Sequence, residues 1–137
     1  MAWALLDADV YIRHFEGRQS ADALAFIQRR FVVRHSAVVL SELRRGARTP
    51  AARKWVERLQ RAAAVRWAPT VSDWWDAGRV VQQLGDRNGW DTAKRRDFQN
   101  DALIAFTARR EGATVVTYNR KDFELLARAV GISVLAL

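Results

Sequence analysis

Short apolar runs alternate with longer amphipathic segments along the whole chain, and this alternation constrains the fold more than any other feature. The apolar runs have the length of strands, and they lie at residues 3–6, 31–33, 65–67, 114–117 and 132–135. Strands that alternate with helices form a parallel sheet covered by helices on both faces. The sequence therefore predicts an α/β fold with a short, central, parallel sheet.

Residues that begin and end helices divide the segments between these runs. Ser20 and Ser36 are predicted N-caps, and Thr49 precedes a proline at the first helical position. Residues 97–110 form the clearest helical pattern, with alanines along one face. The polar stretch 85–94 is predicted to be irregular. Helices are thus expected over residues 9–15, 20–30, 36–46, 50–63, 70–84, 97–110 and 123–130.

Length and composition indicate one domain spanning residues 1–137. The chain is half hydrophobic, and no repeat or linker interrupts it. No run of about 18 apolar residues is present, so no membrane span is expected. The first seven residues lack a basic region and argue against a signal peptide. The absence of cysteine excludes disulfides, thiolate nucleophiles and cysteine-bound zinc, and the reducing cytoplasm is the simplest compartment.

The formal net charge is +8, and arginine supplies 20 of the 23 basic residues. The planar guanidinium group pairs well with phosphate and carboxylate groups. The charge therefore suggests nucleic acid, an acidic protein or both as partners. Genomic codon composition also produces chains rich in arginine and alanine, so charge alone does not choose between these explanations.

Several acidic and amide side chains are placed where ligands bind in α/β folds. Asp7 follows the first strand and Asn119 follows the fourth, so both lie at the carboxyl edge of the predicted sheet. Glu42 and Asp101 lie on predicted helices among apolar neighbours, which points them towards a crevice. Carboxylates that share a small volume raise one another's pKa unless a cation neutralises them. Mg²⁺ and Mn²⁺ are suited to such oxygen ligands.

Each acid also has a simpler explanation. Asp7 or Asp9 would serve as a helix N-cap, and Glu42 would fit a solvated helix face. Asp101 would interact favourably with the positive end of its helix. These explanations do not account for the order and spacing of the whole set.

Two enzyme-like alternatives fit poorly. An Asp-x-Asp pair after the first strand is typical of haloacid-dehalogenase-like phosphatases, but Tyr11 stands where those enzymes have Thr or Val, and their later lysine and acidic pair are not evident. A receiver domain needs a phosphoacceptor aspartate after a central strand, and residues 65–70 contain none.

Four segments together resemble PIN-domain proteins of the VapC toxin type. They are Leu-Leu-Asp-Ala-Asp-Val-Tyr-Ile at 5–12, Leu-Ser-Glu-Leu-Arg-Arg-Gly-Ala at 40–47, Asn-Asp-Ala-Leu-Ile-Ala at 100–105 and Val-Val-Thr-Tyr-Asn-Arg-Lys-Asp-Phe at 115–123. The resemblance covers the full chain in order. It implies a three-layer α/β/α fold and a cytoplasmic, Mg²⁺- or Mn²⁺-dependent endoribonuclease. It also implies RNA as substrate, a VapB-like antitoxin as partner, a homodimer, and 5′-phosphate and 3′-hydroxyl products.

The resemblance also assigns roles to residues. Asp7, Glu42 and Asp101 match the acidic metal-binding positions, and the fourth polar position falls on Asn119, where many relatives have aspartate. Asp122 is a possible additional ligand, although Asn119 and Asp122 also fit a cap pair for the last helix.

Two further predictions concern Asp9 and the RNA contacts. Asp9 replaces the small polar residue that is usual at its position, and its charge either enlarges the site or caps the first helix. Trp90, Arg95 and Arg96 are candidate RNA contacts. The alternative function is a catalytically degraded PIN-like module that binds RNA or protein, and the asparagine at position 119 favours it.

Overall fold

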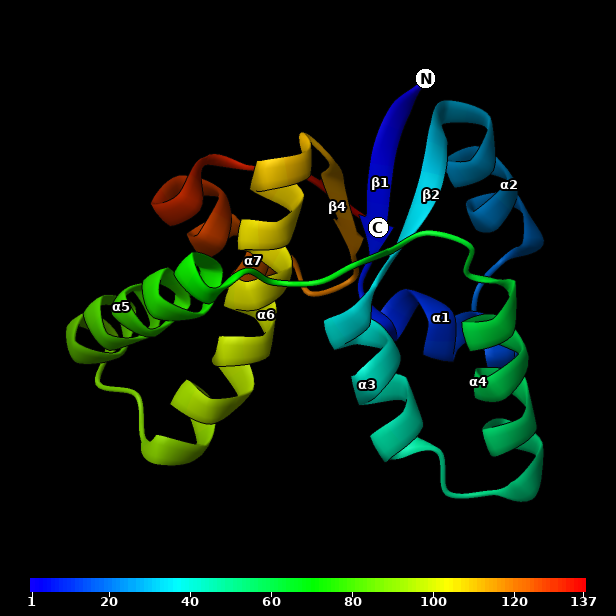
Figure 1. Cartoon of the computed structure of the whole chain (residues 1–137), viewed down its shortest axis with the longest axis horizontal. Coiled ribbons are helices and arrows are strands. Elements are labelled where there is room, and N and C mark those ends of the chain that lie inside the picture. The colour runs from blue at the N-terminus through cyan, green and yellow to red at the C-terminus, as the bar shows by residue number, and fades with distance from the viewer.

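A five-stranded parallel sheet forms the centre of the computed structural model, which describes residues 1–137 apart from the side chain of residue 21 (Figure 1). The strand order is β3-β2-β1-β4-β5, and every neighbouring pair is parallel. The strands are β1 (Ala2–Leu6), β2 (Phe31–Ser36), β3 (Arg66–Trp67), β4 (Thr114–Thr117) and β5 (Ser133–Ala136). The predicted α/β fold with a central parallel sheet is confirmed.

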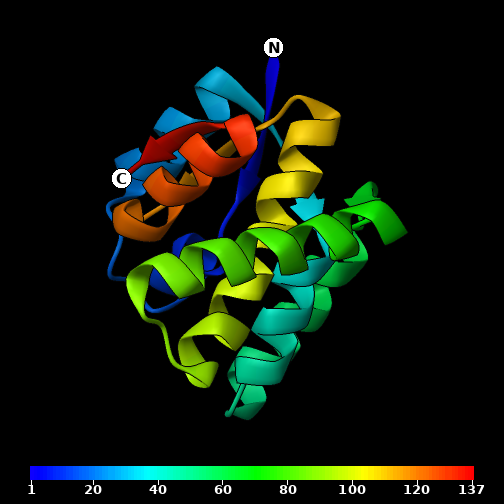
Figure 2. The ribbon, with the colours of Figure 1, turned by 90° about the vertical axis from the view of Figure 1, so that its left-hand side faces the viewer.

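Helices connect the strands and cover both faces of the sheet. They are α1 (Ala8–Phe15), α2 (Ala21–Arg30), α3 (Ala37–Gly46), α4 (Pro50–Ala62), α5 (Val71–Asn88), α6 (Thr92–Glu111) and α7 (Arg120–Leu126), which a π turn at Ala127–Gly131 follows. Figure 2 shows α5 running across α6. Within the described residues, no helix has both the length and the apolar character to cross a membrane.

The central strand β1 divides the core into two layers. Leu5 faces one way and packs with the cluster formed by α3, α5 and α6, whereas Ala4 and Leu6 face the other way and pack with Ile27 of α2. Pairing with β2 and β4 covers both edges of β1, so Ala4 and Leu5 are fully buried. Successive side chains of a strand point to opposite faces, which explains why one apolar run serves two layers. The three-layer arrangement is confirmed.

The predicted N-caps are present. Ser20, Ser36 and Thr49 each accept a hydrogen bond from the backbone N–H three residues later, at 3.3, 3.3 and 3.1 Å. These side chains satisfy N–H groups that have no partner inside the helix. The caps at Ser36 and Thr49 fix where α3 and α4 begin, and α3 carries one of the candidate site residues.

The prediction of an irregular segment at 85–94 was wrong. Helix α5 continues to Asn88, and α6 begins at Thr92, five residues earlier than expected. Gly89 ends α5 with a left-handed backbone (φ 66°), and Asp91 caps α6 by accepting a hydrogen bond from the N–H of Lys94 at 2.8 Å. Most polar side chains in this stretch face solvent on two helices that pack against each other. The spacing of apolar residues is therefore a weak signal here, although the backbone is largely helical.

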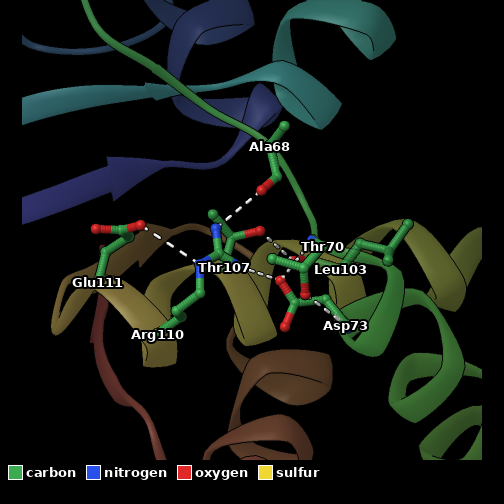
Figure 3. Close-up of polar contacts among 7 residues, drawn as sticks. All are labelled: Ala68, Thr70, Asp73, Leu103, Thr107, Arg110 and Glu111. Atoms are coloured by element: carbon green, nitrogen blue, oxygen red, sulfur yellow. Dashed lines mark hydrogen bonds and ion pairs between the residues drawn. The ribbon is translucent and has the colours of Figure 1, made fainter.

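A polar cluster joins the start of α5 to the end of α6 (Figure 3). Thr70 and Asp73 form a reciprocal capping box, in which each side chain accepts from the other's backbone N–H. Arg110 of α6 pairs with the Asp73 carboxylate and donates to the Ala68 carbonyl at 2.8 Å. Since one arginine ties together a cap, a loop and a second helix, it stabilises the α5–α6 pair.

We expect the substitution Arg110→Met to lower the free energy of unfolding by about 1–2 kcal/mol, because it leaves a nearly buried carboxylate without its cation. The measurement is urea unfolding followed by circular dichroism. Arg109→Met, which changes the exposed neighbouring arginine, is the matched control and is expected to have little effect. Equal effects of the two substitutions would contradict a stabilising role for the pair.

Candidate active site

Asp7 lies where β1 ends and α1 begins, and only 6% of it is exposed. Its Oδ1 accepts a hydrogen bond from the N–H of Ala8 at 2.8 Å, and its Oδ2 accepts one from the hydroxyl of Thr117 at 2.8 Å. Asp7 is therefore a helix N-cap, as the simpler explanation predicted. The hydrogen bond from Thr117 also holds the Asp7 carboxylate at the end of β4. The same side chain therefore caps α1 and belongs to the candidate site.

Thr117 is a residue that sequence reasoning missed. It ends β4, is fully buried, donates its hydroxyl hydrogen to Asp7 and accepts the N–H of Asn119 at 2.9 Å. A hydrogen bond donated to a carboxylate favours the charged form. The available signal was a hydroxyl at the last position of an otherwise apolar strand, next to the sheet edge where Asp7 was expected.

Asp9 connects the first turn of α1 to the residues at the end of β4. Its Oδ1 accepts from the N–H of Tyr118 at 3.3 Å, and its Oδ2 lies 3.5 Å from the Thr117 hydroxyl. Burial raises its pKa, and its charge in turn raises the pKa of Asp7. The structure therefore places Asp9 beside Asp7.

Glu42 and Asp101 reach the same edge from two helices. Glu42 lies on α3 and Asp101 on α6, and these helices stand beside the carboxyl end of β1 (Figure 1). The Oε1 atom of Glu42 is buried and has no hydrogen-bond partner among the described residues. A buried carboxylate oxygen without a donor is costly, which makes it a candidate ligand for a cation.

Electrostatic coupling shows that Asp7, Glu42 and Asp101 share one environment. Burial raises the pKa of Asp7 to about 6, that of Glu42 to about 7 and that of Asp101 to about 9. The charge of Asp7 adds to the increase at both other residues, and Glu42 adds to the increase at Asp101. Burial and mutual repulsion thus act together against ionisation of all three.

Asn119 and Asp122 lie at the same edge, but their side chains bind each other. Asn119 caps α7 by accepting from the N–H of Asp122 at 3.3 Å, and its amide donates to the Asp122 carboxylate at 3.0 Å. Asp122 is only 8% exposed, and its charge raises the pKa of Asp7 and Asp101. The amide of Asn119 thus belongs to a cap, while the charge of Asp122 acts on the acidic cluster.

The carboxylate oxygens of the cluster are suitable ligands for a divalent cation, although they do not converge on one metal position. In the part of the chain that the structure describes, no three His, Cys, Asp or Glu side chains converge closely enough to hold a metal ion. However, the cluster offers carboxylate oxygens only, one of them is an unpaired buried atom, and ionisation is opposed. A hard cation such as Mg²⁺ would relieve both the unpaired oxygen and the repulsion.

Two of the candidate RNA contacts, Trp90 and Arg95, make structural contacts within the protein. Trp90 packs against Phe98 with ring centroids 4.6 Å apart. Arg95 donates to the Trp90 carbonyl at 3.0 Å and pairs with Asp86 at 3.1 Å, so both residues stabilise the connection between α5 and α6. Arg96 is exposed on α6.

The family model for the PIN domain matches residues 4–129. The chain belongs to the PIN domain family. The resemblance noted from four sequence segments is thereby confirmed. No curated protein sequence matches the chain significantly.

Solved structures similar to this PIN domain are toxin–antitoxin complexes. VapBC2 from Rickettsia felis bound to promoter DNA has a TM-score of 0.69 at 17% identity, with 98% of each chain covered. DNA-bound VapBC from Salmonella typhimurium has a TM-score of 0.69 at 20% identity, with 99% of this chain and 98% of that chain covered. VapBC-5 from Mycobacterium tuberculosis has a TM-score of 0.63 at 22% identity, with all of both chains covered. These similarities establish the common fold.

Protonation of Asp101 is expected to control the stability of the metal-free PIN domain. Its pKa lies near 9 in the folded protein and near 3.8 when unperturbed, so the folded state binds more protons. The contribution of this proton to stability is therefore fully present below the unperturbed pKa and is lost as the pH rises towards the folded pKa of about 9. We expect Asp101→Asn to raise Tm at pH 8 and to flatten its pH dependence, as measured by thermal denaturation in chelator. Glu124→Gln, at an exposed position on α7, serves as the control, and identical profiles for Glu124→Gln and Asp101→Asn would contradict the assignment.

Thr117→Val is expected to raise the pKa of Asp7 above its value of about 6, because the hydroxyl that favours the charged carboxylate is lost. Carboxyl ¹³C chemical shifts followed over a pH titration measure this change. Thr117→Ser keeps the hydroxyl and is expected to leave the pKa near the original value. An unchanged pKa in the valine variant would show that the hydrogen bond has no electrostatic effect.

Proposed function

We propose that this PIN domain is the toxin of a type II toxin–antitoxin pair and hydrolyses RNA in a reaction that depends on Mg²⁺ or Mn²⁺. The observation that carries the proposal is the cluster of Asp7, Glu42 and Asp101, which come from three separate elements and oppose one another's ionisation. A protein gains nothing in stability from such a cluster, so its presence indicates a ligand that neutralises it. The VapBC complexes with the same fold support the toxin assignment.

Asp7, Glu42 and Asp101 are the proposed metal ligands. Held by these three side chains, Mg²⁺ or Mn²⁺ would supply a water of lowered pKa and would stabilise negative charge on the phosphate in the transition state. Thr117 keeps the Asp7 carboxylate charged and oriented, and Asp9 holds α1 against the end of β4. The proposed products are a 5′-phosphate and a 3′-hydroxyl, because attack of water on phosphorus in line with the P–O3′ bond breaks that bond and the 3′-oxygen leaves and takes up a proton.

Asp122, rather than Asn119, is the proposed fourth acid of this edge, and it acts on the cluster through its charge and not as a metal ligand. The Asp122 carboxylate is nearly buried and acts electrostatically on Asp7 and Asp101, whereas the Asn119 side chain accepts a backbone N–H as a cap. The departure at position 119 therefore leaves the acidic character of this edge intact.

We propose that the antitoxin binds in an apolar groove that is lined in part by Glu42. It has a volume of about 380 Å³ and lies between α1, α3 and α4. Phe15 and Trp55 stack in it with centroids 4.8 Å apart. A segment that filled this groove would lie at the edge of the acidic cluster, where it would block access. Trp74 and Trp75, 51% and 83% exposed on α5, are proposed to contribute to a homodimer contact.

The second candidate function is a binding module without catalytic activity. Two observations favour it, namely the asparagine at position 119 and the absence of any three converging ligand side chains within the described residues. Such a module would have little affinity for Mn²⁺, which distinguishes it from a nuclease.

We expect Asp101→Asn to reduce RNA cleavage by at least about 100-fold, since loss of a metal ligand removes several kcal/mol of transition-state stabilisation. Antitoxin-free protein is incubated with total bacterial RNA, with Mg²⁺, with Mn²⁺ or with chelator. New 5′ ends are mapped, and their phosphate is tested with an exonuclease that requires it. Glu124→Gln, at an exposed position on α7, is the control. Metal-independent cuts, or full activity of Asp101→Asn, would contradict the proposal, and folded protein that neither cuts RNA nor binds Mn²⁺ would support the binding module.

A further inference from the structure

A lysine lies within the acidic cluster. Lys94 is in the first turn of α6, seven residues before Asp101, so the two side chains project from the same face of that helix. The Nζ atom of Lys94 is 2.7 Å from Oδ2 of Asp122, and the exposed fractions of the two side chains are 36% and 11%. The chain has 3 lysines among its 23 basic residues, and this one pairs with a nearly buried carboxylate beside the site.

The ammonium group is held in position from several sides. The same Oδ2 atom of Asp122 also accepts a hydrogen bond from the Asn119 amide at 3.0 Å. The Lys94 Nζ lies 5.2 Å from the centre of the Trp90 ring and 5.5 Å from that of Phe98, which are distances of a cation–π contact. Trp90, which looked like an RNA contact in the sequence, therefore forms part of the wall around a cation.

The charge of Lys94 acts on the candidate metal ligands. Asp122 raises the pKa of Asp101, while Lys94 lowers it, so the lysine partly offsets the effect of the carboxylate that it binds. One carboxylate of the acidic edge thus has a permanent cationic partner, whereas the Oε1 atom of Glu42 has none among the described residues.

We propose that Lys94 is a built-in counter-ion that keeps Asp122 out of the metal-ligand set, so that the free protein holds one divalent ion on Asp7, Glu42 and Asp101. Lys94 is then a positioning residue that acts through Asp122. The inference rests on the proposed function, which supplies the metal ion. The Lys94–Asp122 ion pair itself is observed in the structure.

A purely structural role predicts a different outcome. Lys94 and Asp122 also tie α6 to α7, and if this were their whole role, removing the ammonium would loosen the site and weaken metal binding. If Lys94 withholds Asp122 from the ion, removing the ammonium adds a carboxylate to the ligand set. Affinity for divalent ions rises with the charge of the ligand set. The two roles therefore shift Mn²⁺ affinity in opposite directions.

The experiment measures Mn²⁺ binding to antitoxin-free protein by isothermal titration calorimetry, with Mn²⁺ electron paramagnetic resonance to count bound ions. Lys94→Met and, as a second variant, Lys94→Gln are expected to bind Mn²⁺ about tenfold more tightly than the original protein, or to take up a second ion. Lys94→Arg keeps a cation on Asp122 and is expected to leave binding unchanged. Lys121→Met, beside Asp122 in sequence but exposed, is the matched control.

The double variant with Lys94→Met and Asp122→Asn provides the decisive comparison. It is expected to return Mn²⁺ affinity and ion count to those of the original protein, since no freed carboxylate remains. Urea unfolding in chelator of the original protein, Lys94→Met, Asp122→Asn and the double variant measures the coupling energy between Lys94 and Asp122 without metal. A favourable coupling is expected. Circular dichroism confirms that each variant is folded.

Several outcomes would overturn the inference. Unchanged or weaker Mn²⁺ binding by Lys94→Met and Lys94→Gln, with the original protein binding one ion, would refute it and leave the proposed function standing. Zero coupling in the unfolding cycle would show that the pair is not formed in solution. Failure of the original protein and of both lysine variants to bind Mn²⁺ would refute the proposed function together with this inference.

Discussion

The site depends on the Asp7 carboxylate, which is buried at the point where β1 ends beside β4. Burial opposes its charge, whereas the Thr117 hydroxyl and the Ala8 N–H favour it. The same hydrogen bonds set the direction in which α1 leaves the sheet and fix the separation of two strand ends. One interaction therefore positions the first helix, aligns β1 with β4 and places a negative charge where α3 and α6 bring two more.

The acidic cluster opposes the stability of the fold that contains it. The rest of the protein compensates through the two core layers around β1 and through the Arg110–Asp73 pair that joins α5 to α6. Because α6 carries both Arg110 and Asp101, the helix that bears the most strongly perturbed acid is also fixed at its far end. Rigidity of this kind keeps repelling carboxylates together when local relaxation would separate them.

Positive charge has two roles in this PIN domain. Most arginines are exposed and add to a basic surface that suits a polyanion. Lys94 instead lies between Asp122 and two aromatic rings, where its charge acts on the acidic cluster at short range. The mixed charge of this edge distinguishes it from a site made of carboxylates alone.

The sequence by itself determined the fold class, because apolar runs of strand length alternate with capped amphipathic helices and this order favours a parallel sheet. It also determined which acids lie at the carboxyl edge, since Asp7 directly follows a buried strand and such positions meet at one edge of a parallel sheet. The extents of α5 and α6 were not evident, because polar residues on their solvent faces obscure the helical period between Gly85 and Lys94.

Only the tertiary structure decided which of the remaining polar side chains stabilise the fold and which act on the acidic cluster. In the sequence, the fourth polar position falls on Asn119, and Asp122 has only a possible additional role. The start of α7, however, turns the asparagine back onto the helix as a cap, and the charge of the aspartate acts on the cluster. Thr117, Trp90 and Lys94 belong to patterns that also occur in ordinary cores and surfaces, and their roles follow from neighbours 5 to 110 positions away. Hydrogen bonds and charge interactions depend on distance in space, and for these residues the fold alone sets that distance.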